Sequence, residues 1–178
     1  MRSGLSRRGF VQMAAGASVL AGTVGSASAA HHRKFSLALA AGNIGAKGDL
    51  AQLIQWAEQY GYESVAPNGG ELTKASAEQL AELKATMKAK GLRWAAGSPG
   101  ADIRAKSETD FAAQLKGIPA SAKTLQAAGV TRVKTWISPA HDELTYLANF
   151  RLHADRIRRI AEVLEDYGIR FGLEYVGP

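Results

Sequence analysis

Three side chains suited to chemistry, Glu174, Lys134 and Trp136, lie on two β-rich segments, IRFGLEYV from residue 169 and VTRVKTWI from residue 130. Side chains alternate between the two faces of a strand, so all three fall opposite the apolar residues of their segments. A carboxylate on the inward face of a sheet is costly unless something pairs with it. A metal ion, substrate hydroxyls or a lysine could pair with Glu174, and an internal ion pair with Lys134 is the purely structural alternative.

Loops that follow two of the predicted strands, the one from Val130 and the one from Tyr62, hold further polar candidates. His141 comes just after Pro139, where contact with a substrate is one interpretation, and the neighbouring Asp142 is expected to cap the next helix. Asn68 lies in the loop PNGGEL, which is Gly-rich but matches no phosphate-loop or dinucleotide fingerprint. We expect Trp136, Lys134, His141 and Asn68 to be the substrate-binding candidates.

A repeated segment explains how these residues are positioned. It recurs as EQYGYESVAP, KAKGLRWAAGSP, QAAGVTRVKTWISP and EDYGIRFGLEYVGP, each with a helix end followed by a glycine, a short β-rich run and a proline. Glycine tolerates the left-handed conformation that ends a helix, and proline marks where the strand has stopped. The chain is therefore built from βα units, and the loops after the prolines lie at the C-terminal edge of the sheet.

The predicted elements alternate along the whole segment after residue 30. Strands are expected from Phe35, Tyr62, Leu92, Val130 and Ile169. Helices are expected after Asp49, after Ser76 with Gln79 at capping-box spacing, between Ser107 and Ala128, and before Gly168. Gly117 and Pro119 predict a kink or two pieces in the third helix.

Five parallel strands joined by four helices fit an α/β fold, either an open doubly wound sheet or a partial (β/α)8 TIM barrel. A complete barrel needs roughly 250 residues, and this sequence reaches its last strand with no helix to cover it. We therefore expect residues 31–178 to form the N-terminal portion of a barrel, with the last strand as an exposed edge prone to aggregation.

The first thirty residues have the composition of a signal peptide. A basic start that includes the pair Arg7 and Arg8 precedes a weakly apolar stretch, and Ala27 and Ala29 frame an A-x-A cleavage site. The SRRGF segment resembles the twin-arginine motif, so we expect residues 1–30 to be read by the twin-arginine export machinery. The localisation that follows is periplasmic or secreted. A retained N-terminal tail is the alternative.

Charge argues against a nucleic-acid partner. The formal net charge is +6, and removing the three arginines of residues 1–30 leaves 19 basic and 16 acidic residues, or +3. The densest basic stretch, which holds Arg151, Arg156, Arg158 and Arg159, is interpreted as a solvated helix face rather than a phosphate-binding patch. With no cysteine, the chain has no disulfide and no thiolate site.

Three segments resemble the sugar phosphate isomerase/epimerase family, whose members have a xylose isomerase-like barrel: GYESV after WAEQYG, ISP before a long helix, and GLEYVGP. The resemblance covers about Phe35 to Pro178. It implies that Glu174 is a ligand to a divalent metal ion and a catalytic acid/base, while the family's other ligands, an Asp, a His and a second Glu, come from later strands.

The resemblance further implies movement of hydrogen next to a sugar carbonyl, assisted by a divalent metal ion such as Mn, Mg, Co or Zn. Trp136 would lie against a sugar ring, although packing is the commoner role of such a tryptophan. The alternatives are a non-catalytic carbohydrate-binding or scaffold protein that retains the barrel, and metal-dependent phosphodiester cleavage. We expect the chain by itself to be inactive. The sequence leaves the sugar, its phosphorylation and the number of subunits open.

Overall fold

A computed structural model of the protein describes residues 34–176, and those from Ser36 onward belong to one compact unit. The signal peptide predicted at residues 1–30 lies outside the described residues. The strands are β1 (Ala38–Leu39), β2 (Ser64–Val65), β3 (Arg93–Trp94), β4 (Arg132–Ile137) and β5 (Arg170–Tyr175). The helices are η2 (Ala41–Ile44), α2 (Leu50–Gln59), α3 (Gly69–Leu72), α4 (Ala77–Ala89), α5 (Glu108–Ala127) and α6 (Tyr146–Glu165).

All strand pairs are parallel and follow the order of the chain. β1, β2 and β3 form one sheet and β4 and β5 form another. A single bridge joins the two sheets, in which the Gly97 amide donates to the Arg132 carbonyl at 3.0 Å and the Lys134 amide donates to the Gly97 carbonyl at 2.8 Å. This sequential parallel order is that of a (β/α)8 barrel wall, and the partial barrel predicted from the sequence is confirmed.

The helix boundaries follow the predicted caps. Asp49 caps α2 and Ser76 caps α4, and each forms a full capping box with the Gln three residues on. The glycine after each crossover helix has positive φ, between 65° and 83° at Gly61, Gly91, Gly129 and Gly168. The short helices η2 and α3, which follow β1 and β2, were not predicted.

Helix α5 shows that one of the two predicted outcomes, two separate pieces around Gly117 and Pro119, is wrong; the kink stays a prediction. It runs from Glu108 to Ala127 as one helix, with Pro119 inside it. Proline removes one backbone donor, but Phe111, Ile118 and Ala122 form a fully buried stripe on this helix. Packing of such a stripe supplies most of a helix's stability in a protein, so it holds the helix together across the proline.

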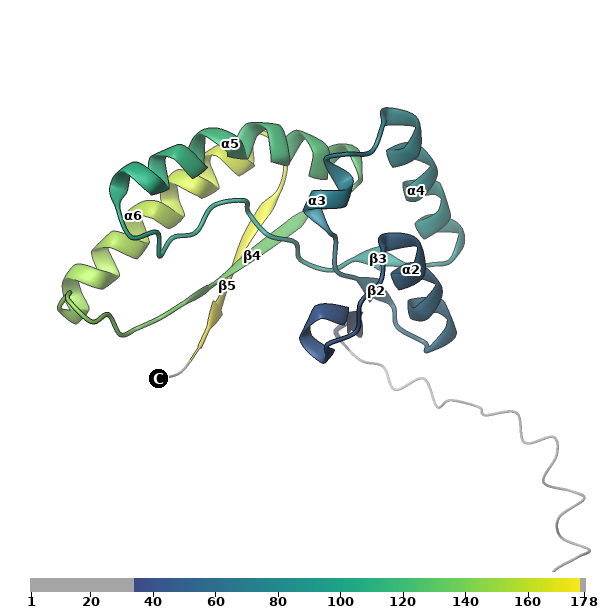
Figure 1. Ribbon diagram of the computed structural model, residues 1–178, viewed down its shortest axis with the longest axis horizontal. Coiled ribbons are helices and arrows are strands. Elements are labelled where there is room, and N and C mark those ends of the chain that lie inside the picture. The colour runs from purple at the N-terminus through teal and green to yellow at the C-terminus, as the bar shows by residue number, and fades with distance from the viewer. Residues whose placement is uncertain (1–33, 177–178) are drawn as a thin grey trace, which may run out of the picture. The chain divides into compact units, whose positions relative to one another are not determined.

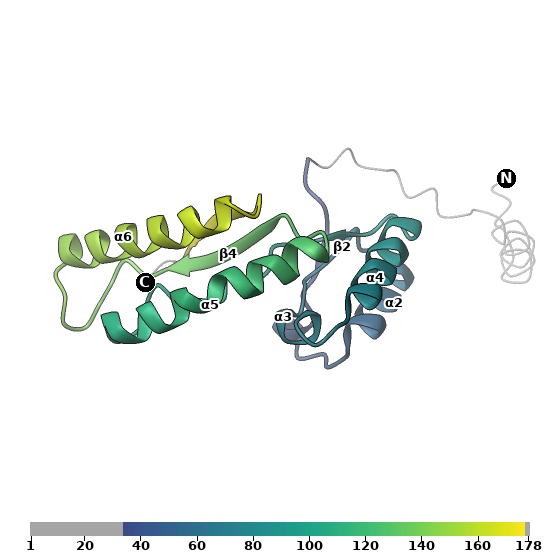
Figure 2. The same ribbon diagram turned by 90° about the horizontal axis from the view of Figure 1, so that it is seen from above.

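Helices α5 and α6 lie side by side along one face of the β4–β5 pair (Figures 1 and 2). Val133 and Thr135 of β4 are buried, whereas Lys134 and Trp136 are exposed, so the predicted alternation holds. In β5 it holds less well. Leu173 belongs to the apolar face of this segment, opposite Glu174, yet it is exposed, because only the start of the strand is covered.

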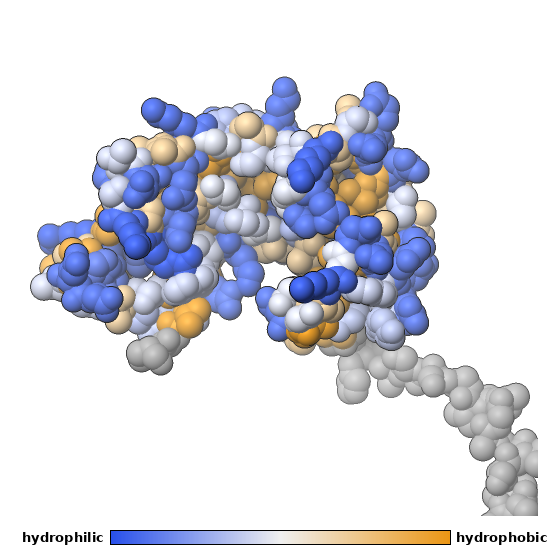
Figure 3. Space-filling view, in the orientation of Figure 1, coloured by the Kyte–Doolittle hydropathy of each residue, from blue (hydrophilic) through white to orange (hydrophobic). Residues whose placement is uncertain are grey.

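The side of the molecule in Figure 3 is largely hydrophilic and is hollowed beneath the β4–β5 pair, where polar side chains project. The face of β4 and β5 opposite α5 and α6 carries the exposed Lys134 and Trp136, and we call it the uncovered face. Among the described residues β5 pairs with β4 alone, which leaves its other edge open. Within residues 34–176 no helix has the length and apolar character needed to cross a membrane.

Candidate functional site

The uncovered face of β4 and β5 brings together three of the predicted residues. Trp136 and Glu174 are directly paired across the parallel ladder. The Lys134 Nζ donates to Glu174 Oε2 at 2.5 Å, and each side chain is about half exposed (52%). The ion pair that the sequence offered as an alternative is therefore formed. An exposed pair of this kind contributes about 0–1 kcal/mol to stability, so both charges stay accessible to a ligand at small cost.

Trp136 is held by Arg104 from the loop between β3 and α5. The guanidinium of Arg104 lies 3.5 Å from the centre of the Trp136 ring. Its Nε donates to Asp102 Oδ1 at 2.7 Å, and its backbone amide donates to the same oxygen. Burial alone would raise the pKa of Asp102, but the side-chain and backbone hydrogen bonds from Arg104 outweigh it and lower that pKa.

Two cavities are lined in part by this stacked pair. The smaller, of about 440 Å³, is lined by Lys134 and Asp102 together with Arg104 and Trp136. The larger, of about 960 Å³, shares Arg104 and Trp136 and reaches the start of α6. Both lie where β4 ends, the edge at which barrel enzymes bind their substrates.

The larger cavity is lined by buried polar residues of α6 that sequence reasoning missed. Asn149, His153 and Arg156 are each at least nine-tenths buried. The prediction that Arg156 lies on a solvated helix face is therefore wrong, because this residue is 2% exposed. Arg151 and Arg158 are exposed, as predicted. The helical periodicity of the sequence could have shown that these three positions are buried. Counting back from Leu164 and Ile160 in steps of three or four residues reaches all three of them.

Arg156 can be buried because its guanidinium donates hydrogen bonds to two backbone carbonyls. Its Nη1 donates to the Ile103 carbonyl at 2.8 Å and to the Ala105 carbonyl at 2.9 Å. Its guanidinium also lies 4.9 Å from the centre of the Phe111 ring. The two carbonyls flank Arg104 in the chain, so α6 fixes the loop that positions the Arg104–Trp136 stack.

The cavity wall carries charges of both signs, with Arg104, Lys106 and Arg156 against Asp142 and Glu143. Burial lowers the pKa of His153, and the nearby Arg156 and Arg104 lower it further. His153 is thus favoured in its neutral form. The cavity also contains His141, whose Nδ1 accepts hydrogen bonds from the backbone amides of Glu143 and Leu144 at 3.0 and 3.1 Å.

The expected helix cap at Asp142 is wrong. Helix α6 begins at Tyr146, and Thr145 caps it by accepting from the Ala148 amide at 3.4 Å. The intervening turn is closed instead by the ring of His141, which leaves Asp142 at the wall of the larger cavity.

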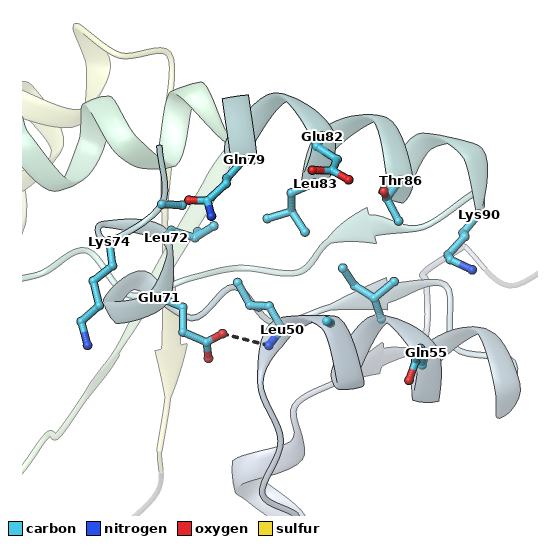
Figure 4. A pocket seen from close by; sticks show the side chains of 13 residues that line it. Leu50, Gln55, Glu71, Leu72, Lys74, Gln79, Glu82, Leu83, Thr86 and Lys90 are labelled. Atoms are coloured by element: carbon cyan, nitrogen blue, oxygen red, sulfur yellow. Dashed lines mark hydrogen bonds between the residues drawn. The ribbon is translucent and has the colours of Figure 1, made fainter. Parts of the chain in front are cut away.

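Asn68 lies apart from these cavities and has a structural role. Its side chain caps α3 by accepting from the Gly70 amide at 3.1 Å, and it donates to Glu71 Oε1 at 2.6 Å. Glu71 in turn accepts from the Leu50 amide at 2.9 Å, as Figure 4 shows. A substrate contact of Asn68 remains a prediction.

Figure 4 shows the cavity of about 640 Å³ between α2 and α4, where Leu50, Leu72 and Leu83 face one another. It lies in the helix layer and contains none of the predicted site residues. We therefore assign the candidate site to the end of β4 and not to this cavity.

The described residues do not fit a divalent metal ion by themselves. Within residues 34–176 no three His, Cys, Asp or Glu side chains are grouped so as to hold one. Glu174 is the only predicted ligand here, and the Lys134 ammonium beside it would repel a cation. Among residues 34–176, Glu174 is the one carboxylate that the sequence predicted for such a site.

The chain belongs to the family described as xylose isomerase-like TIM barrel, because the family model matches residues 54–178. The resemblance seen in the sequence is thereby confirmed. A comparison with curated proteins found no match.

Solved structures share the fold. A xylose isomerase domain protein from Alicyclobacillus acidocaldarius is 28% identical with a TM-score of 0.59, covering 74% of this chain and 47% of that one. The IOLI protein, described with a bound zinc atom, is 15% identical with a TM-score of 0.65 and coverages of 80% and 52%. A 3-keto-D-glucoside 4-epimerase from E. coli is 18% identical with a TM-score of 0.52 and coverages of 67% and 48%. The chain thus spans about half the length of these structures.

Proposed function

We propose that this chain forms part of a sugar isomerase or epimerase, and that the uncovered face of β4 and β5 meets the substrate. The observation that carries the proposal is the Lys134–Glu174 pair, half exposed on that face beside the Trp136 ring. Membership of a barrel family whose fold is shared by a sugar epimerase supports it.

In the proposed reaction, the Glu174 carboxylate takes the proton from the carbon next to the sugar carbonyl. The electrons move into an enediolate, and the proton is then returned to carbon. The ammonium of Lys134, 2.5 Å from Glu174, supplies positive charge beside the oxygen that becomes negative. Trp136 would hold the apolar face of the sugar, a role its position over a cavity wall allows.

We further propose that a divalent ion, Mn, Mg, Co or Zn, is needed for turnover. The described residues supply one candidate ligand, Glu174, so the other ligands of such a site would have to come from elsewhere. The zinc described in the IOLI protein supports this only by likeness of fold.

Hydrogen exchange tests the proposal. A panel of aldoses and ketoses is incubated in D₂O with the protein and each metal ion, and proton NMR follows loss of the signal from the carbon next to the carbonyl. We expect exchange from a polypeptide carrying the remainder of the barrel, binding without exchange from the 178-residue chain, and no exchange in Glu174→Gln. Glu162→Gln, an exposed change on α6, is the matched control. Undiminished exchange in Glu174→Gln would show that this carboxylate is not the base.

A non-catalytic carbohydrate-binding protein is the second candidate. It is favoured by the fact that Glu174 is already engaged by Lys134, and that residues 34–176 group no three metal ligands. Sugar binding with no exchange for any sugar or metal, even with the barrel complete, would establish it.

We also propose that the protein is exported through the twin-arginine pathway to the periplasm or beyond. The support is the sequence of residues 1–30, namely the Arg7–Arg8 pair and the Ala27 and Ala29 site.

A further inference from the structure

A cavity at the end of β4 opposite the candidate site is lined by four basic residues and by no acidic one. It has a volume of about 470 Å³ and lies between α4 and the starts of β3 and β4. Its basic residues are Lys84, Lys88, Arg93 and Arg132. Arg93 and Arg132 are the first residues of their strands, so the cavity lies at the N-terminal edge of the barrel wall. We name it the basic cavity.

The four charges have no acidic partner among residues 34–176. All four residues are exposed. Every ion pair within this part of the chain uses other basic side chains, namely Lys90, Arg104, Lys134, Arg156, Arg158 and Arg159. Glu63 lies on the segment beside Arg93, but it is not part of the cavity wall, and its carboxylate accepts from the Leu37 amide at 2.9 Å.

The fold gives little reason of its own for this concentration of charge. Arg132 is directly paired with Arg170 across the parallel ladder of β4 and β5. Like charges in directly opposite positions on neighbouring strands are destabilising. Lys88 has a local role, because it lies in the last turn of α4, where the helix dipole favours a cation. Arg93 and Arg132 have no such role, so an anion bound in the cavity would offset an unfavourable interaction.

Two walls of the basic cavity are held in place by the fold. Gly129 lies in the turn before β4 with a φ of 83°, and a methyl group there would lie 3.3 Å from Lys84 Cε. The aliphatic part of Lys84 therefore packs on the backbone that leads into β4. Trp94 forms another wall, and its Nε1 donates to the Ala128 carbonyl at 2.9 Å. Walls that are fixed before a ligand arrives reduce the entropy lost on binding.

We propose that the basic cavity binds a multiply charged phosphate group, such as a diphosphate or triphosphate, at a site separate from the substrate face. The planar guanidinium of arginine matches phosphate oxygens, and lysine binds phosphate as a point charge. Four positive charges around one hollow suit a group with several negative charges better than a single carboxylate. The N-terminal edge of a barrel serves stability rather than catalysis, so this ligand should stabilise the fold without reacting. The inference does not rest on the proposed function.

Calorimetric titration of the 178-residue chain, in low-salt buffer free of phosphate and metal ions, tests this. The probes are inorganic phosphate, pyrophosphate and citrate, which is a carboxylate of comparable charge. We expect pyrophosphate to bind most tightly, and Arg132→Gln to weaken it at least about tenfold, the effect of losing one charged hydrogen bond. Lys116→Gln, an exposed change on α5 outside the cavity, should leave the affinity unchanged.

Thermal unfolding gives a second readout, in which the site and a merely structural role differ in sign. Without the anion, Arg132→Gln should melt at the wild-type temperature or above it, because the change removes the repulsion with Arg170. Pyrophosphate should raise the melting temperature of wild type and of Lys116→Gln, and raise that of Arg132→Gln much less.

A third measurement locates the anion and needs no variant. In the wild-type chain labelled with 5-fluorotryptophan, pyrophosphate should shift the fluorine signal of Trp94, which lines the basic cavity. The signal of Trp136, which lines the cavities at the other end of β4, should stay in place.

No saturable pyrophosphate binding, or equal affinity in Arg132→Gln and wild type, would overturn the proposal. A shift of Trp136 in place of Trp94 would also overturn it, because the anion would then lie at the candidate site. Citrate that binds as tightly as pyrophosphate would rule out a phosphate site. Tighter binding of a single-stranded oligonucleotide, weakened equally by Lys116→Gln, would replace the cavity with a nucleic-acid surface. None of these readouts depends on turnover, so a failure here is distinct from a failure of the isomerase assignment.

Discussion

Replacing Arg156 by methionine should destabilise the fold. We expect this even though the substitution removes a buried charge, which by itself would favour the folded state. Arg156 is 2% exposed, and its Nη1 donates to the carbonyls of Ile103 and Ala105. Methionine has a similar length and fills much of the same space, but it donates no hydrogen bond.

The expected loss combines two opposing terms. Leaving the buried Ile103 carbonyl and the part-buried Ala105 carbonyl unsatisfied costs about 1–3 kcal/mol each. Removing a buried guanidinium also removes its desolvation penalty, which offsets part of this loss. Its ion pair with Glu108 is long, at 3.5 Å, and Glu108 is largely exposed, so that pair adds little. We therefore expect Arg156→Met to lower the free energy of unfolding by about 2–4 kcal/mol.

Urea unfolding measured by circular dichroism gives the free energy from the midpoint and slope. Arg158→Met is the matched control, because its side chain is 68% exposed on the same helix, and it should unfold near the wild-type midpoint. Equal midpoints for Arg156→Met and wild type would refute the reasoning, since the carbonyl bonds would then give no net stabilisation.

Three further changes have definite outcomes. The pKa of His153 is lowered in the fold, so the unfolded chain binds more protons below about pH 6.5, and stability should fall as pH drops from there through the folded pKa. Urea midpoints between pH 7.5 and 5 should show this slope, and His153→Gln should flatten it. A methyl group at Gly97 would lie 2.9 Å from Pro67 Cγ. Gly97→Ala should therefore overpack this contact, destabilise the fold by about 1–3 kcal/mol and lower the melting temperature. Gly42→Ala is the control, because a methyl group there meets no atom within 4 Å and causes no overpacking. Changing Arg7 and Arg8 to lysine should leave the protein in the cytoplasm, as cell fractionation would reveal; unimpaired export would rule out the twin-arginine route.

Local signals in the sequence predicted most of the fold. The capping residues Asp49 and Ser76 and the glycines after each helix act within a few residues of their own positions, so their patterns are readable without a structure. The first three strands were predicted to begin one to three residues too early, because they begin at Ala38, Ser64 and Arg93. β1, β2 and β3 have two paired residues each, because a ladder depends on a neighbour's register as well as on β propensity.

The candidate site was predictable only in part. Alternation along β4 and β5 placed Lys134, Trp136 and Glu174 on one face, and the structure agrees. Arg156 was misjudged because its partners, the carbonyls of Ile103 and Ala105, are about fifty residues away in the chain. Periodicity alone marks a buried position, but it cannot reveal that a distant loop will accept an arginine there.

One titration tests whether the uncovered face of β4 and β5 binds sugar. The chain has three tryptophans, which 5-fluorotryptophan labelling converts into three fluorine NMR signals. Trp94 donates its Nε1 proton to the Ala128 carbonyl at 2.9 Å, and Trp56 packs against the core, so both serve as internal references. On addition of a neutral ketose we predict that the Trp136 signal shifts while the other two stay in place. An unmoved Trp136 signal at saturating sugar, or equal shifts of all three, would contradict the assignment of this face as the substrate site.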